Sequence, residues 1–425
     1  MSAKTIIFSI IGAIILLQVL IFFRILPGRN APTPDNVELS FWGTDKLEVW
    51  RETIQDFKDR FPYIAVAYTQ FDAGNYEDML VNKIAEGNGP DVFMLPNALI
   101  LKNRDKIFPL TQQALSFSPQ RFASTFVDGA YQQLVTPDGS IYGLPLFIDT
   151  PVLFYNKDIL NAAGTAQVPT RWDELVTLSR QLTQKNAIGE ITKTGLPLGT
   201  SRTIDNSFEI LSTLILQEGD SIVTQSLSPD VELRQGAAKA MAFYTSFADP
   251  AQKNYSWSDR MPNSLTAFAQ TTSAFAIGFS SDIARIRAKN PHLNFGIAPF
   301  PQKNNAPVPV VYGRYVFPTV LKFSKNPAAA WQFVNYLASF EGASKYLRKT
   351  LLPPARRDIL SAKAPISDLD IFYRQALIAR GWAIPDNAAT RNLFQDAIDS
   401  VVSGTSDSSK TMDNLGQRLD LLLPK

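Results

Sequence analysis

The stretch "NYEDMLVNKIAEGNGPDVFML", residues 75–95, holds a helix pattern followed directly by a strand pattern. Its residues Tyr76, Leu80 and Ile84 are spaced four apart, as on the buried face of a helix. The glycines in "EGNGP" end that helix. The following "DVFML" is apolar after its first residue, which is typical of a strand buried on both faces. The stretch therefore predicts a helix that leads into a parallel sheet.

The preceding residues contain the same alternation of strand and helix. Residues 37–41 and 64–68 alternate apolar and polar side chains, as strands do. Between them lies a helix pattern that Thr44 and Asp45 can cap and that Pro62 ends. Strand, helix, strand, helix and strand in this order predict a βαβαβ unit. Ligands of such sheets bind beyond the carboxyl ends of the strands.

Length and composition limit the possible classes of protein. A chain of 425 residues is too long for one hydrophobic core, so two lobes are expected. Hydrophobic residues at 45% and charged residues at 19% indicate a folded protein. The net charge of +2, without a long basic run, argues against a nucleic-acid-binding protein. The chain has no cysteine, which excludes disulfides and thiolate chemistry and is compatible with an extracytoplasmic location.

The N-terminal region predicts a membrane anchor. Residues 5–23, "TIIFSIIGAIILLQVLIFF", carry no charge, and Lys4 and Arg24 flank them. This run is long enough to cross a bilayer as a helix and longer than the usual apolar core of a cleaved signal peptide. Small residues placed for cleavage are not evident before Pro27. We expect an uncleaved single-pass anchor, a linker over residues 24–36, and the remainder of the chain outside the membrane.

A second stretch, "GLPLFIDTPVLFYNKDIL" (residues 143–160), combines a strand pattern with polar groups. Asp149 interrupts an apolar run, and Tyr155 follows the subsequent Thr-Pro pair. Either these groups satisfy each other in a core, or they face a ligand.

Taken in order, the motifs resemble family 1 of the extracellular solute-binding proteins, which includes the sugar receptors of ABC importers. The resemblance runs from about Glu38 to about Arg356. It rests on "FWGT", "NYEDMLVNKIAEGNGPDVFMLPN", "YGLPLFIDTPVLFYNKDIL", "VPTRWDELVTLSRQL", "FAIGFSSDI", "NFGIAPFP" and "GRYVFPTVLKFSKNPAAAWQFVNYLAS".

The resemblance implies an α/β fold, the two-lobed periplasmic-binding-protein fold of type II. It places residues 37–148 with 302–350 in the first lobe and residues 149–301 with 351–425 in the second. The lobes would close on a solute in the cleft between them, with no cofactor, and deliver it to ABC transporter permease subunits.

Sugar recognition needs flat apolar surfaces for the ring and planar polar groups for the hydroxyls. The resemblance and the positions of the loops give these candidates: Trp42, Asn97, Asp149, Tyr155, Phe279, Ser280, Tyr312, Arg314 and Tyr315, with Trp257 and Trp382 placed less securely. In contrast, Trp50, Trp172 and Trp331 lie on helical stripes and are expected in the core. Thr170 is expected to cap the helix that carries Trp172.

Two positions depart from the family pattern. Phe279 and Ser280 lie where relatives often have tryptophan, so a strong stacking platform is not expected there. The run "YGRY" around Arg314 is bulkier than usual, which a narrower cleft or a charged substituent on the ligand would explain. Arg314 can also be interpreted as an ion-pair partner between the lobes.

Two other functions compete with that of a transport receptor. A glycoside hydrolase needs two carboxylates, here Asp149 with Asp72 or Asp282, but no spacing requires that pair. A carbohydrate-sensing protein could instead signal through the N-terminal helix. The only histidine, His292, has no catalytic or metal-binding partner in the sequence and is expected in a surface turn. We therefore expect a non-enzymatic receptor for a sugar or similar polar solute.

Overall fold

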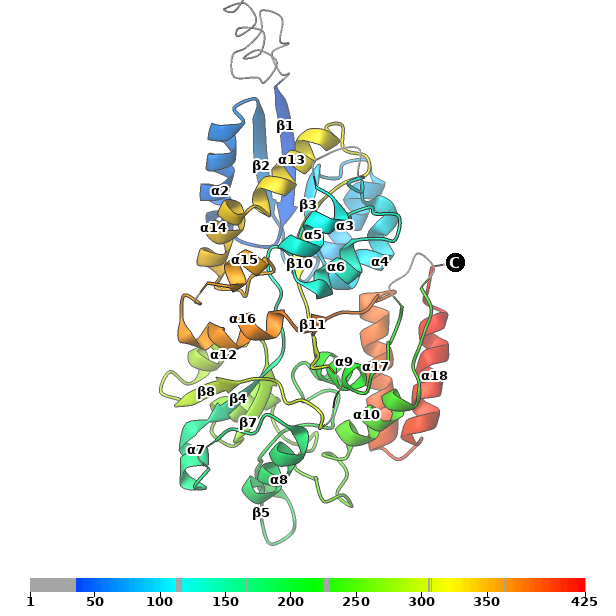
Figure 1. Cartoon of the computed structure of the whole chain (residues 1–425). Helices are drawn as coiled ribbons and strands as arrows, with labels where there is room; N and C mark the ends of the chain where they lie inside the picture. Colours follow the sequence, from blue (N-terminus) through cyan, green and yellow to red (C-terminus); the bar gives the residue numbers. More distant parts are fainter. Residues whose placement is uncertain are drawn as a thin grey trace, which may run out of the picture.

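The computed structural model describes residues 36–424 except 112–116, 166, 225–228, 305, 307 and 363. The predicted anchor at residues 5–23 and nearly all of the linker lie outside this part of the chain. Within it, no helix is both long and apolar enough to span a bilayer. The chain forms two lobes, one above the other in Figure 1.

The first lobe is built on a four-stranded sheet in the order β10-β3-β1-β2. Strand β1 (Val37–Gly43) is parallel to both β2 (Ile64–Gln70) and β3 (Val92–Pro96), as the sequence predicts. Strand β10 (Val316–Val320) adds to β3 in the antiparallel direction. The helices of this lobe are α2 (Leu47–Arg60), α3 (Tyr76–Ala85), α4 (Ile100–Asn103), α5 (Pro119–Thr125), α6 (Asp128–Leu134), α13 (Pro327–Leu337), α14 (Phe340–Thr350) and α15 (Arg357–Leu360).

The second lobe contains a three-stranded antiparallel sheet in the order β7-β4-β8. Its strands are β4 (Val152–Asn156), β7 (Phe275–Gly278) and β8 (Phe295–Ala298), and β5 (Gln184–Lys185) pairs with β6 (Ile191–Lys193) in a hairpin. Its helices are α7 (Lys157–Ala162), α8 (Trp172–Leu182), α9 (Ser207–Gln217), α10 (Gln235–Thr245), α11 (Ser264–Ala269), α12 (Asp282–Lys289), α16 (Asp370–Ala376), α17 (Asn387–Val402) and α18 (Ser408–Asp420).

Each lobe has its own hydrophobic core, as the chain length predicts. Trp50 and Trp331 are buried in the core of the first lobe, and Trp172 is buried in the core of the second. These placements confirm the expectation from their helical spacing. His292 lies in an exposed turn, also as expected.

Two predicted helix caps are wrong. Helix α2 begins after Lys46, and neither Thr44 nor Asp45 caps it; the Asp45 carboxylate instead accepts a hydrogen bond from Tyr346 Oη at 3.2 Å. Helix α8 begins after Arg171 and not after the predicted cap Thr170, and the extended backbone of Arg171 forms a bridge with Gln302. Tertiary contacts therefore moved both helix starts past the residues with capping side chains.

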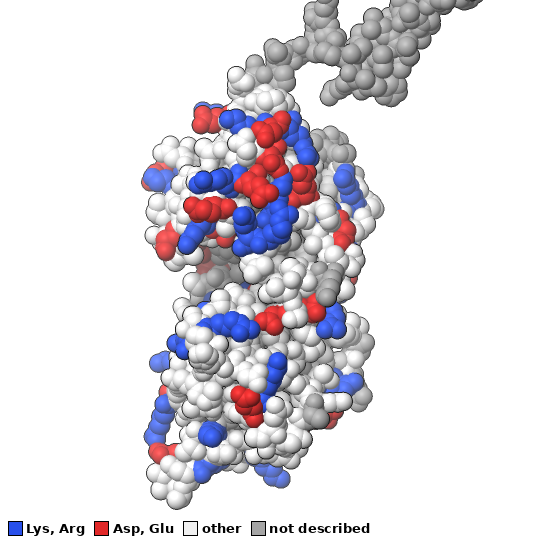
Figure 2. All heavy atoms as spheres, turned by 90° about the vertical axis from the view of Figure 1, so that its left-hand side faces the viewer, with Lys and Arg blue, Asp and Glu red and all other residues white. Residues whose placement is uncertain are grey.

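The surface of the first lobe carries charges of both signs. Figure 2 shows basic and acidic residues intermixed on the upper lobe. Ion pairs between α2 and α14 contribute to this mixture, including Arg60 with Glu341 at 2.7 Å and Arg348 with Glu52 at 3.3 Å. Because the side chains of these pairs are 45–60% exposed, they stabilise the fold little.

The chain crosses between the lobes at three places: near residues 148–151, near residues 311–315, and between α15 and α16. Residues 376–383 then run along the junction between the lobes. Strand β9 (Val311–Tyr312) pairs in parallel with β11 (Ala379–Arg380). Two short segments belong to the other lobe than the resemblance implies. Strand β9, expected in the first lobe, packs into the second core, and Ala355, expected in the second lobe, packs into the first core.

A prediction concerns Gly143, the first residue of the stretch 143–160, which packs against β10. A Cβ atom at this position would lie 2.1 Å from Cδ2 of the buried Phe317 ring. We expect Gly143→Ala to lower the free energy of unfolding by about 1–3 kcal/mol, because the packed ring must shift. Chemical denaturation measures this change.

Gly416 in α18 provides the matched control, since a Cβ there would meet its nearest neighbour at 3.7 Å. Gly416→Ala should leave stability unchanged or raise it by up to about 1 kcal/mol, as expected for a helix interior. Equal effects of the two substitutions would contradict the proposed clash.

Candidate functional site

The carboxyl ends of the parallel strands in the first lobe point toward the second lobe (Figure 1). Near this end of β1, Trp42 is half-buried and packs against Phe71, which follows β2, with ring centroids 4.8 Å apart. The Tyr76 hydroxyl donates a hydrogen bond to the Trp42 carbonyl at 3.3 Å. The first lobe thus presents a supported aromatic group at the position expected for a ligand site.

The first polar group lies where the chain crosses between the lobes. Residues Asp149, Phe279, Ser280 and Arg314 come together here, and we call them the hinge cluster. The backbone N–H of Arg314 donates to the carbonyl of Asp149 at 2.9 Å, and that of Asp149 donates to the carbonyl of Arg314 at 2.8 Å. Four predicted site residues therefore converge on one point.

The Asp149 carboxylate is 1% exposed, and both of its oxygens are occupied. Oδ1 accepts from the backbone N–H groups of Thr150 (3.1 Å) and Ser280 (3.2 Å). Oδ2 accepts from Ser280 Oγ at 2.9 Å and from Arg314 Nη2 at 3.4 Å. Burial raises the pKa of Asp149 above its ordinary value of 3.8, while Arg314 and Ser280 oppose that rise.

Arg314 covers the aromatic ring of the hinge cluster. Its guanidinium carbon lies 3.5 Å from the centre of the Phe279 ring, and Phe279 is fully buried. Nη2 also donates to Ser281 Oγ at 2.8 Å. The Arg314 side chain remains 36% exposed, so it is the accessible part of this cluster.

A second polar group, the Arg391 cluster, consists of Phe208, Glu209, Tyr312 and Arg391. Arg391, in the second turn of α17, lies 4.5 Å above the Phe208 ring centre and forms an ion pair with the buried Glu209. The second oxygen of Glu209, Oε2, has no partner among the described residues. The Arg391 side chain is 43% exposed.

Tyr312 connects the two clusters. Burial raises the pKa of its phenol, Glu209 raises that pKa further, and Arg391 and Arg314 lower it. Its ring packs against that of Phe208, with centroids 6.2 Å apart, and Arg314 follows two residues later in the chain. The sequence predicted Tyr312 but not Glu209 or Arg391, whose contact joins residues 182 positions apart and leaves no local pattern.

Asn97 is buried, and its side chain supports the crossing strand. Its Nδ2 donates to the carbonyl of Gly313 at 3.2 Å, and its Oδ1 accepts from the backbone N–H of Tyr315 at 3.1 Å. Nδ2 also donates to Gln133 Oε1 at 3.1 Å. Asn97 thus fixes the backbone on both sides of Arg314.

The other predicted site residues are not exposed members of the two clusters, although the Trp382 ring packs 5.8 Å from that of Phe208. Tyr155 is near the far end of β4, packed so closely on β8 that a Cβ at Gly296 would lie 2.3 Å from its hydroxyl. Tyr315, Trp257 and Trp382 are at most 2% exposed and belong to the two hydrophobic cores. In this structure the rings of Tyr315, Trp257 and Trp382 present no appreciable surface to a solute, because core packing encloses them.

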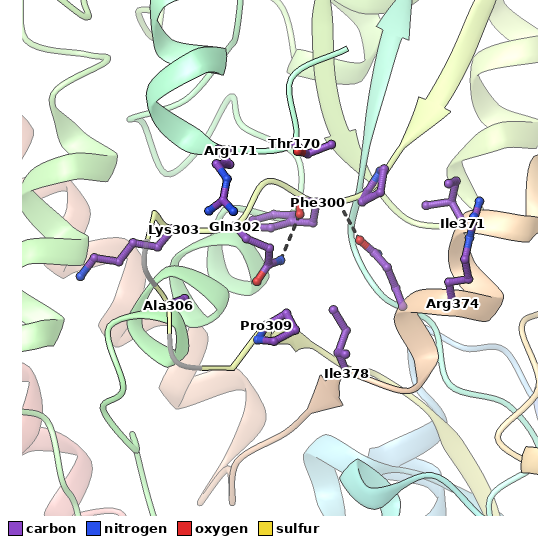
Figure 3. A pocket seen from close by; sticks show the side chains of 12 residues that line it. Thr170, Arg171, Phe300, Gln302, Lys303, Ala306, Pro309, Ile371, Arg374 and Ile378 are labelled. Atoms are coloured by element: carbon purple, nitrogen blue, oxygen red, sulfur yellow. Dashed lines mark hydrogen bonds between the residues drawn. The ribbon is translucent and has the colours of Figure 1, made fainter. Parts of the chain in front are cut away.

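Three pockets in the described part of the chain, of about 700, 750 and 830 Å³, include neither cluster. Figure 3 shows a pocket of about 700 Å³ in the second lobe, where Arg171 and Arg374 lie on opposite sides of Phe300. Its amides are engaged, since Gln375 Oε1 accepts from the backbone N–H of Phe300 at 2.6 Å and Gln302 Nε2 donates to the Phe300 carbonyl at 3.0 Å. A second groove, of about 750 Å³, lies at the C-terminal end of α9, whose N-terminal end carries Phe208 and Glu209.

Comparisons with known proteins agree with this architecture. A family model described as "Bacterial extracellular solute-binding protein" matches residues 52–372. The chain belongs to this family. The maltodextrin-binding protein MdxE of Bacillus subtilis is 27% identical over 322 residues, which cover 72% of this chain and 71% of that protein. The sn-glycerol-3-phosphate-binding periplasmic protein UgpB of Escherichia coli is 23% identical over 424 residues, with 91% and 92% covered.

A solved structure of the sugar-binding protein MalE from Xanthomonas citri aligns with a TM-score of 0.73 at 22% identity, covering 91% of this chain and 97% of that one. The family membership confirms the resemblance found in the sequence, and the structural likeness confirms the two-lobed α/β fold.

This solute-binding protein also has an ion pair between its lobes. Lys102 of α4 lies 2.8 Å from Asp386, the residue that caps α17, and 3.0 Å from Glu77. Hydrogen bonding to Asp386 raises the pKa of Lys102, and the same contact lowers the pKa of Asp386. Because α17 carries Arg391, the pair connects the first lobe to the Arg391 cluster.

We predict that Lys102→Glu shifts the ligand-free protein toward a more open arrangement, because the introduced carboxylate would face those of Glu77 and Asp386. Adding Asp386→Lys should partly reverse the shift. The change is measurable as a distance between spin labels on cysteines introduced at Gln55 of α2 and Lys410 of α18, since the chain has no native cysteine.

Lys83→Glu is the control for this experiment, because Lys83 pairs with Glu86 inside the first lobe. An unchanged distance in Lys102→Glu, or the same change in Lys83→Glu, would contradict a role for the pair in lobe closure.

A pH prediction follows from Asp149. Its raised pKa means that the folded protein binds a proton at higher pH than the unfolded chain does. The contribution of Asp149 to the free energy of unfolding should therefore fall as pH rises from about 3.8 to the raised pKa, by at most about 1.4 kcal/mol per pH unit. Denaturation of the parent and Asp149→Asn across this range measures the difference.

Asp149→Asn should become more stable relative to the parent as pH rises through that window. The opposite trend would show that the Arg314 ion pair outweighs desolvation.

Proposed function

We propose that the chain is a membrane-tethered, extracytoplasmic receptor that captures a carbohydrate or similar polar solute between its lobes for import by an ABC transporter. The hinge cluster is the observation that carries this proposal. It places a partly exposed guanidinium on a segment that joins the lobes, next to a carboxylate bonded to both the crossing strand and the second lobe. The solutes for which MdxE and UgpB are named, maltodextrin and glycerol 3-phosphate, support a polar, hydroxyl-rich solute.

Capture would depend on contacts that exist together only in the closed form. Trp42 belongs to the first lobe, Arg391 to the second, and Arg314 to a segment between them. A solute that contacts all three stabilises closure by its differential affinity for the closed state. The tether in this proposal is the apolar segment at residues 5–23, which places the lobes near the permease subunits.

The chemistry of Asp149 favours binding over hydrolysis. A glycosidase carboxylate must reach the substrate as a nucleophile, acid or base. Asp149 is buried with four hydrogen bonds to its two oxygens. Asp282, its proposed partner, is also buried, and its carboxylate accepts from the backbone N–H of Phe279 at 2.9 Å and from Arg285 at 2.6 Å.

A thermal-shift screen of the full-length protein in mild detergent, against mono- and oligosaccharides, polyols and their acidic derivatives, tests the function. A solute at one hundred times its Kd should stabilise the protein by roughly 2.7 kcal/mol and be recovered unchanged. Trp42→Ala should weaken binding, whereas Phe323→Ala, which removes a ring 71% exposed in the first lobe, should not.

Consumption of the solute would show that the protein is an enzyme and would contradict the proposed receptor function. If no solute in the screen shifts the melting temperature, the proposal that the protein captures such solutes is wrong. Membrane fractionation tests the tether separately: the full chain should sediment with membranes.

A further inference from the structure

We infer that the solute is acidic, a sugar or polyol that carries a carboxylate or phosphate group. The inference rests on the proposed function and specifies the class of solute. Its basis is that the second lobe and the crossing strand present guanidinium groups to the site where a receptor for neutral sugars would present aromatic ring faces.

Neutral sugar rings bind by placing their C–H faces on exposed aromatic rings. The two rings best placed for this in the clusters, Phe279 and Phe208, are 0% and 4% exposed. Arg314 covers the first at 3.5 Å and Arg391 covers the second at 4.5 Å. A solute that reaches this wall therefore meets guanidiniums first.

The two arginines of the clusters keep unused hydrogen-bond donors. A guanidinium has five N–H groups. Arg314 uses only Nη2, toward Asp149 and Ser281, and Arg391 uses Nε toward Asn387 and Nη2 toward Glu209. Nε and Nη1 of Arg314 and Nη1 of Arg391 donate to no described residue.

The carboxylates of the same clusters are not available to a solute. Both oxygens of Asp149 are occupied, and the free Oε2 of Glu209 is buried. The site therefore favours a ligand that is rich in hydrogen-bond acceptors. Carboxylate and phosphate oxygens match the planar fork of a guanidinium and form its strongest hydrogen bonds.

The arrangement of charge supports the same conclusion. The formal charges of Arg314 and Asp149, and of Arg391 and Glu209, cancel in pairs. The carboxylates are nevertheless 1% and 3% exposed, whereas the arginine side chains are 36% and 43% exposed. Each pair thus directs its positive end toward solvent. The nearby Arg285 is held by Asp282 and Asp205, so it adds no uncompensated charge.

Isothermal titration of the full-length protein with matched solutes tests the inference. The pairs are glucose with glucuronate, glucose with glucose 6-phosphate, and glycerol with glycerol 3-phosphate; inorganic phosphate and acetate control for ion binding alone. We expect one acidic member to bind at least about tenfold more tightly than its neutral counterpart. The uronate and phosphate arms distinguish the two acidic groups.

Variants connect the preference to the two arginines. Arg314→Gln and the double variant Glu209→Gln/Arg391→Gln should each lower the acidic preference by about tenfold. The double variant avoids leaving an unpaired buried carboxylate, and Arg391→Lys keeps the charge without the fork. Arg418→Gln is the control, because Arg418 is 48% exposed and also pairs with an acid of α17, Asp396.

Neutral solutes that bind as tightly as acidic ones would overturn the inference and leave the receptor function intact. Binding of the inorganic ions alone, or an acidic preference that survives in folded Arg314→Gln and double variants, would overturn it as well. Silence with every solute in the wider screen would instead overturn the receptor function.

Discussion

The structure between the lobes depends on satisfying one buried charge. Asp149 lies where the chain leaves the first lobe, and an unpaired carboxylate at such a site would cost several kcal/mol. Its four hydrogen bonds come from Thr150, from the backbone and hydroxyl of Ser280, and from Arg314. These residues lie just before β4, in the turn after β7, and between β9 and β10. A single carboxylate thereby joins three segments distant in sequence and determines where the Arg314 side chain lies.

Local patterns were enough to predict the framework of the first lobe. The spacing of Tyr76, Leu80 and Ile84 and the apolar run of β3 depend only on neighbouring residues, so the βαβαβ unit could be identified before its partners were known. The placement of β10 could not be predicted in this way. That strand comes more than 200 residues after β3, and its antiparallel pairing depends on how the chain returns from the second lobe. The same limit explains the two wrong caps, where tertiary contacts decided the helix starts.

A site residue could be predicted from the sequence only when it is unusual for its segment. Asp149 interrupts an apolar run, and Arg314 stands among bulky residues, so both could be selected from the sequence. Trp382 is equally conspicuous in the sequence, but it stacks on Phe394 inside the second core, with ring centroids 5.9 Å apart. Arg391 is an ordinary residue of an amphipathic helix, and only its contact with Glu209 distinguishes it. Composition cannot separate a buried indole from a ligand platform, because the difference lies in distant packing partners.

The two arginines also show how such a site can be stable and still ready to bind. An isolated long cation at an interface would lose much side-chain entropy on binding a solute. Here each guanidinium already rests on a phenylalanine ring and is fixed from behind by a buried carboxylate. The carboxylates neutralise the charge while leaving outward N–H groups free. Asn97 adds rigidity by bonding the backbone on both sides of Arg314. The donors are thereby held in place before a solute arrives, so less of the binding free energy is lost in ordering them.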